Sequence, residues 1–147
     1  DIQLIVIDYM QLIHSTSRRA RDNRQQEITE ISGGIKTLAK ELRLPVIVLS
    51  QLNREMERDK TRKPRLSDLR ESGAIEQDAD IVGLLYKPAS GEDEEDGLTD
   101  PNEGEPVNLL IAKQRNGPTG DVHLTFLKSY TRFENAARIS PEDVPLE

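Results

Sequence analysis

Four polar side chains follow apolar runs in this sequence, and together they could bind a metal ion and a polyphosphate. They are Asp8 after LIVI (4–7), Gln51 after VIVL (46–49), and Lys113 and Arg115 after VNLLIA (107–112). In open α/β sheets, ligands bind beyond the carboxyl ends of the strands. A carboxylate, an amide and two cations suit Mg²⁺ and a polyphosphate, where catalysis is mainly positioning and charge neutralisation. Each signal alone has an ordinary alternative, because an acid after an apolar strand is more often a helix cap or a turn residue.

The elements that must position these residues are short strands and a helix. The runs at 4–7, 46–49 and 81–86 are nearly continuous, which predicts parallel strands covered on both faces. Between the first two runs, apolar residues recur at helical spacing and Pro45 follows. They are Ile28, Ile31, Ile35, Leu38, Ala39 and Leu42. Gly33 and Gly34 inside this helix predict a kink or a close packing contact, since each costs up to about 1 kcal/mol relative to alanine.

A hairpin closes the pattern. VNLLIA (107–112) and VHLTFL (122–127) are joined by the turn-rich NGPTG, a connection that is too short for anything but antiparallel pairing. The chain of 147 residues is long enough for one domain with a real core. We therefore predict a single α/β domain with a mainly parallel sheet, flanked by helices and ending in an antiparallel hairpin.

The charge distribution is more informative than the net charge of -7. Residues 14–24 hold four arginines against one acid, and residues 53–65 hold six basic residues against three acids. The acids concentrate in a segment at 88–106, which reads as a mobile acidic insertion. Basic loops are commonly just solvated, but these could also track a nucleic-acid backbone. Because neither loop contains an aromatic residue, such binding would be nearly independent of sequence.

Other chemistries find little support. Zero cysteines exclude disulfides, thiolate catalysis and cysteine-ligated zinc, and two separated histidines, His14 and His123, make a poor metal site. There is no apolar run of about 18 residues and no basic-then-apolar leader. We therefore expect a cytoplasmic protein with no membrane partner.

The sequence closely resembles the bacterial replicative DNA helicases of the DnaB family, in the second half of their RecA-like motor domain. The resemblance covers nearly the whole chain and rests on four segments in order: LIVIDYMQLI (4–13), LPVIVLSQLNR (44–54), LSDLRESGAIEQDADIV (66–82) and AKQRNGPTG (112–120). The third and fourth are the most specific. The resemblance implies a partial RecA-like fold and an ATP-dependent, ring-forming helicase that moves on single-stranded DNA and unwinds duplex at the replication fork.

The resemblance also implies roles for individual residues. Asp8 matches the Walker B aspartate that holds Mg²⁺, usually through water, and Gln51 matches the glutamine that senses the terminal phosphate of ATP. Arg115 matches the arginine finger that reaches the neighbouring subunit's nucleotide, with Lys113 as its partner. The loop that grips the single-strand backbone corresponds to Arg70, Glu71 and Gly73, and the loops at 14–24 and 53–65 match the other channel-facing loops. The implied partners are single-stranded DNA, five further copies in a hexamer, primase and a helicase loader.

The sequence departs from the family pattern because it contains no GxxxxGK[ST] phosphate loop. We therefore expect a partial ATPase domain, running from the Walker B strand to the C-terminus and lacking the Walker A half. Such a chain should not hydrolyse ATP alone. Two alternatives stay open: another RecA-like ATPase, such as a recombinase or a phage primase-helicase, and a non-catalytic module for single-strand binding or oligomerisation.

Overall fold

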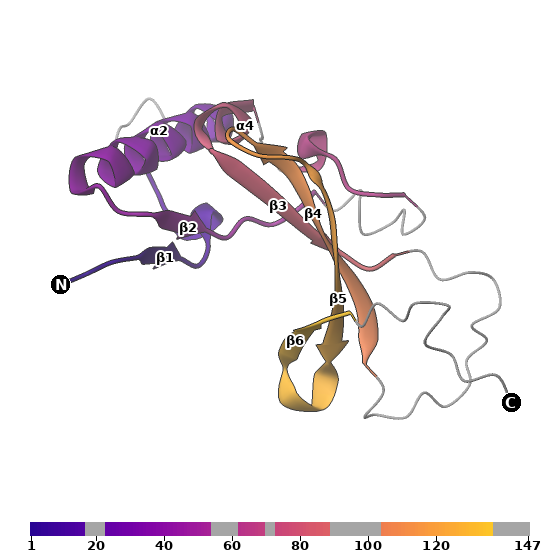
Figure 1. Cartoon of the computed structure of the whole chain (residues 1–147). Helices are drawn as coiled ribbons and strands as arrows, with labels where there is room; N and C mark the ends of the chain where they lie inside the picture. Colours follow the sequence, from indigo (N-terminus) through magenta and orange to yellow (C-terminus); the bar gives the residue numbers. More distant parts are fainter. Residues whose placement is uncertain (17–22, 54–61, 70–72, 89–103, 137–147) are drawn as a thin grey trace, which may run out of the picture.

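The computed structural model describes residues 1–16, 23–53, 62–69, 73–88 and 104–136, and within them the strands form two sheets (Figure 1). β1 (Ile5–Ile7) and β2 (Val46–Val48) pair in parallel, and α2 (Arg24–Leu42) connects them. α4 (Gly73–Asp78) precedes an antiparallel sheet. Its strands, in order, are β3 (Ile81–Tyr86), β4 (Glu105–Gln114), β5 (Gly120–Leu127) and β6 (Arg132–Asn135). Short 3₁₀ turns occur at Met10–Leu12, Leu66–Asp68 and Lys128–Tyr130.

The α/β class, the strand–helix–strand crossover and the final hairpin are confirmed. The expectation that residues 81–86 form a parallel strand is wrong, because β3 pairs antiparallel with β4. β3 buries Val82 and Leu84 but exposes Ile81 and Leu85. The strand therefore alternates as an ordinary one-faced strand, and apolar residues on its exposed face hide the alternation. The parallel part of the described residues is limited to β1 and β2.

Helix α2 begins and ends where the local sequence directs it. The Asn23 side chain accepts a hydrogen bond of 3.0 Å from the Gln25 amide, and Arg43 ends the helix in the left-handed conformation with φ 53°. Between these ends the helix is uninterrupted. The close contact expected at Gly33 and Gly34 is absent from the described residues, since a Cβ built on either would meet no atom within 4 Å.

Two apolar clusters form the core, and α4 contributes to both. The first contains buried Met10, Ile28 and Ile31 and packs α2 against β2 and the turn after β1. The second contains buried Leu69, Val82 and Leu84 and packs β3 against β4 and the turn at Leu66–Asp68. Ile75 of α4 packs against both. This short helix therefore packs between the cluster beneath the parallel strands and the cluster beneath the antiparallel sheet.

One face of the parallel pair is uncovered in the described residues. Leu4, Val6, Ile47 and Leu49 are 46–57% exposed, and Val6 and Ile47 are direct neighbours across the pair. The opposite face packs on α2 through Val48. The expectation of cover on both faces is therefore not met within these residues. No helix in the described ranges is long and apolar enough to span a bilayer.

A β-bulge lies near the end of β4. Val82 of β3 pairs with Lys113, but the next residue, Gly83, pairs with Ile111, so Ala112 is an extra residue on β4. Bulges turn the side chains that follow them and are common beside functional sites. This one stands directly before Lys113 and Arg115.

Candidate functional site

Asp8 and Gln51 lie at the same edge of the parallel pair, as predicted. The Leu49 amide donates to the Ile7 carbonyl and the Met10 amide donates to the Leu49 carbonyl, both at 2.9 Å, so the chain around Asp8 runs beside the end of β2. The Gln11 side chain then donates to Ser50 Oγ at 2.9 Å. Asp8 and Gln51 are both exposed at this edge. An accessible carboxylate and amide are thus brought together where a nucleotide could bind.

The segment after Gln51 pairs with the segment before Arg70. Leu52 forms an isolated antiparallel bridge with Leu69, and the Asn53 amide donates to the Asp68 carbonyl at 2.7 Å. Arg70 and Glu71 themselves lie outside the described residues. Gly73 is exposed and begins α4, with open space around its Cα. Direct backbone contacts therefore join the segment that follows Gln51 to the residues just before the predicted DNA-binding loop.

Lys113 and Arg115 lie together, but among the described residues they make no hydrogen bond or ion pair with Asp8 or Gln51. Both point at the last turn of α4. Lys113 Nζ donates to the Glu76 and Gln77 carbonyls, and Arg115 Nη2 donates to the Gln77 carbonyl at 2.6 Å. Carbonyls at a helix C-terminus lack helical donors, and these cations supply them. The structure thus separates the predicted site into a carboxylate–amide pair and a cation pair.

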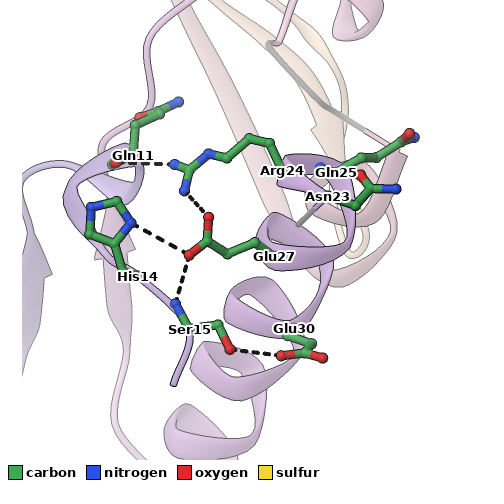
Figure 2. A network of polar contacts seen from close by, with 8 residues as sticks. All are labelled: Gln11, His14, Ser15, Asn23, Arg24, Gln25, Glu27 and Glu30. Carbon is green, nitrogen blue, oxygen red and sulfur yellow. Dashed lines mark hydrogen bonds and ion pairs between the residues drawn. The ribbon is translucent and has the colours of Figure 1, made fainter. Parts of the chain in front are cut away.

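A buried acid that sequence reasoning missed lies beside the first basic loop (Figure 2). Glu27, in the first turn of α2, is 4% exposed. Its carboxylate accepts the Ser15 amide at 2.8 Å and the Arg24 guanidinium, and lies 3.4 Å from His14 Nδ1. The Ser15 amide and Arg24 hold the pKa of Glu27 below its usual value. Because Ser15 and Arg24 flank residues 17–22, Glu27 ties the two ends of that loop together.

This network also reaches the strand-end edge. Arg24 Nη2 donates to the Gln11 carbonyl at 3.0 Å, and the Gln11 side chain contacts Ser50. Gln11 Oε1 is buried with no hydrogen-bond partner in the described part of the chain. The only sequence signal for Glu27 was its place in a helix first turn, three residues after an arginine.

The second basic loop has a similar buried acid at its base. Asp68 is 8% exposed, and its carboxylate accepts both outer nitrogens of Arg62 at 2.8 Å and the Arg65 amide at 2.7 Å. The Arg62 contact lowers the pKa of Asp68, with the Arg65 amide adding to the effect. Since the Asp68 carbonyl also binds the Asn53 amide, this residue fastens both sides of residues 54–61.

The side chains fit Mg²⁺ only as part of its coordination shell. No group of three or more His, Cys, Asp or Glu residues that could hold a metal occurs in the described ranges. Mg²⁺ keeps several waters and is commonly bound by one or two carboxylates together with substrate phosphates. An exposed Asp8 at a strand end suits that mode. His14 contacts Glu27 and His123 contacts Asn108 at 2.9 Å, so the two histidines lie in separate environments.

Comparisons with known proteins all match this chain to one family. Residues 1–135 match the family model of the DnaB-like helicase C-terminal domain. The chain is 50% identical to the replicative DNA helicase DnaB of Geobacillus stearothermophilus over 136 residues, which is 92% of this chain and 28% of that protein. It is likewise 50% identical to the replicative DNA helicase DnaC of Bacillus subtilis over 135 residues, again 92% and 28%. The chain thus spans little more than a quarter of these relatives.

Solved structures give the same result. One solved ATPase domain superposes with a TM-score of 0.73 at 42% identity, covering 91% of this chain and 44% of that one. A DnaB-like replicative helicase, described with its interactions with primase, superposes with a TM-score of 0.74 at 41% identity, covering 91% and 30%. The partial ATPase fold expected from the sequence is therefore confirmed.

Proposed function

The chain belongs to the family of DnaB-like helicase C-terminal domains, and from this premise we propose that it forms part of an ATP-driven motor that moves along single-stranded DNA and unwinds duplex at the replication fork. The curated relatives are replicative DNA helicases. This favours the replicative helicase over a recombinase or a phage primase-helicase.

In this proposal Asp8 holds Mg²⁺ through water and Gln51 contacts the terminal phosphate of ATP. Their shared, exposed position at the ends of β1 and β2 supports these roles. The metal would supply charge neutralisation on the phosphates. The chain contains no phosphate loop, so ATP binding requires residues from outside this sequence.

The observation that carries the proposal is the backbone connection from the nucleotide edge to the DNA loop. Gln51 is followed by Leu52, which bridges to Leu69, and Leu69 is followed by Arg70. If Gln51 moves when phosphate is released, the Leu52–Leu69 bridge would pass that movement to the residue next to Arg70. Arg70, Glu71 and Gly73 would grip the DNA backbone, with the basic loops at 14–24 and 53–65 adding sequence-independent attraction.

Lys113 and Arg115 act in the nucleotide site of a neighbouring subunit. A head-to-tail ring brings one subunit's cations to the next subunit's phosphates. Their lack of contact with Asp8 and Gln51 in the described residues is consistent with action across an interface. We extend the proposal to a homo-hexamer in the cytoplasm, with primase and a helicase loader as partners.

Mixed rings test this arrangement in a full-length protein that carries the chain. Arg115→Ala should nearly abolish DNA-stimulated ATP hydrolysis, because fingers of this kind contribute about 10³ to 10⁵ in rate. Asp8→Ala should do the same from the other side of the interface. Rings assembled from both variants contain some interfaces with wild-type Asp8 and Arg115, so activity should return on mixing. If mixed rings form and remain inactive, Arg115 does not act across the interface.

A further inference from the structure

The Arg115 guanidinium is held from two sides. Its Nε lies 3.2 Å from Asp80 Oδ1, and its Nη2 donates to the Gln77 carbonyl at 2.6 Å. Its Nη1 has no hydrogen-bond or ion-pair partner among the described residues. A guanidinium is planar, so two contacts fix the direction of the third nitrogen. The remaining nitrogen is left for a ligand.

Asp80 is itself fixed. Its other carboxylate oxygen accepts Lys36 Nζ of α2 at 2.5 Å, and its carbonyl accepts the Arg115 amide at 2.9 Å. The Lys36 hydrogen bond lowers the pKa of Asp80, and the charges of Arg115 and Lys113 act in the same direction, so the carboxylate is ionised at neutral pH. An exposed ion pair contributes little to stability. The Asp80–Arg115 pair matters here because it orients the guanidinium.

We propose that Asp80 is a positioning residue for Arg115: it orients the guanidinium so that one outer nitrogen is presented to the terminal phosphates of a nucleoside triphosphate in the neighbouring subunit. This inference rests on the proposed function of Arg115. Asp80 lies two residues after the end of α4 and directly before β3, so the group that orients Arg115 is next to the helix that packs against both apolar clusters. Without it, Arg115 keeps its charge but loses its fixed direction.

A double-mutant cycle in the full-length ring separates positioning from folding. Asp80→Asn should lower kcat for DNA-stimulated ATP hydrolysis about 10- to 100-fold and leave KM for ATP nearly unchanged, because only the reacting geometry is disturbed. In an Arg115→Ala background, Asp80→Asn should cause no further loss. Asp80→Glu keeps the charge and should recover part of the activity.

Glu134→Gln is the matched control, because it neutralises the acid of another exposed pair with an arginine, Arg132–Glu134. It leaves the contact between Asp80 and Arg115 in place, so kcat should stay within about twofold of wild type, while thermal melting should fall by the same small amount as in Asp80→Asn. Equal losses of kcat in Glu134→Gln and Asp80→Asn would overturn the proposal, as would a further loss from Asp80→Asn in the Arg115→Ala background. If Arg115→Ala keeps a wild-type kcat, the proposed role of Arg115 in ATP hydrolysis is wrong. If Arg115→Ala is impaired and Asp80→Asn has a normal kcat, only the proposed role of Asp80 is wrong.

Discussion

Replacing Asp68 with alanine should destabilise the domain far more than the loss of an ordinary surface acid. Asp68 is one of two charged side chains that are buried among the described residues. Its carboxylate accepts three N–H groups, two from Arg62 and one from the Arg65 backbone. The alanine variant removes the carboxylate that both the Arg62 guanidinium and the Arg65 amide bind.

The size of the effect follows from burial. Hydrogen bonds to charged groups contribute about 1.5–3 kcal/mol each, and breaking a buried ion pair costs about 3–5 kcal/mol. The Arg62 side chain is 35% exposed and regains contact with water when Asp68 is removed. We therefore expect a loss of unfolding free energy near the lower end of the values for a buried ion pair. A loss of about 2–4 kcal/mol lowers Tm by roughly 5–15 °C in a chain of this size.

Circular dichroism during thermal and urea unfolding measures this loss directly. Glu134→Ala is the control, because it removes the carboxylate of an exposed Arg132–Glu134 pair and should cost at most about 1 kcal/mol. If the two variants lose the same stability, Asp68 is no more than a surface acid and the reasoning from burial is refuted.

The same variant has a pH signature. The Arg62 contact lowers the pKa of Asp68 in the folded state, so this group stabilises the fold fully above its unfolded pKa of about 3.9 and loses that contribution as pH falls through the lower folded value. The difference in the free energy of unfolding between wild type and Asp68→Ala should therefore be constant from neutral pH to about pH 5 and become smaller below about pH 4. A difference that grew in acid would contradict this assignment.

Further predictions concern the core, the network at Glu27 and the proposed function. Ile28 is 1% exposed and Leu42 is 50% exposed on the same helix, so Ile28→Ala should cost about 2–5 kcal/mol in urea unfolding and Leu42→Ala under about 1, although both remove the same number of atoms. Because the pKa of Glu27 is lowered on folding, Glu27→Gln should flatten the loss of stability in acid, measured as Tm against pH. Arg70→Ala in the full-length protein should weaken single-strand binding equally for all sequences and reduce the salt slope by roughly 0.7. The chain alone should show no Asp8-dependent ATP hydrolysis in a phosphate-release assay.

The positions of Asp8 and Gln51 were predictable because strand ends follow from short apolar runs. The contacts of Lys113 and Arg115 were not predictable, because they depend on the pairing of β4 with β3 and on the position of α4. No local pattern encodes such long-range contacts. β3 was misread for a related reason: its exposed face carries Ile81 and Leu85, so the run reads as continuous.

The buried acids were also invisible in the sequence. The chain has 27 acidic residues, and nothing in composition distinguishes Glu27 or Asp68 from the exposed majority. The Glu27 carboxylate is buried where it binds donors from both sides of residues 17–22, Ser15 and Arg24. The Asp68 carboxylate binds Arg62 and Arg65, and its backbone carbonyl binds Asn53 from the other side of residues 54–61. The strand β6 was missed because its four residues, RFEN, are too few to show a period. Its Phe133 ring packs on the Phe126 ring, with 4.7 Å between the ring centroids.

The bulge at Ala112 makes the direction of the two cations independent of the exact length of β4. Ile111 lies opposite Gly83 and Lys113 lies opposite Val82, so one extra residue is accommodated without disturbing the pairing on either side of it. Deleting Ala112 would remove the bulge and leave Lys113 opposite Val82, which keeps its side chain on the same face of the sheet. The direction of Lys113 and Arg115 is therefore set by the pairing with β3 and not by their spacing from Ile111. A sequence that is one residue shorter at this point can still place both cations at the last turn of α4.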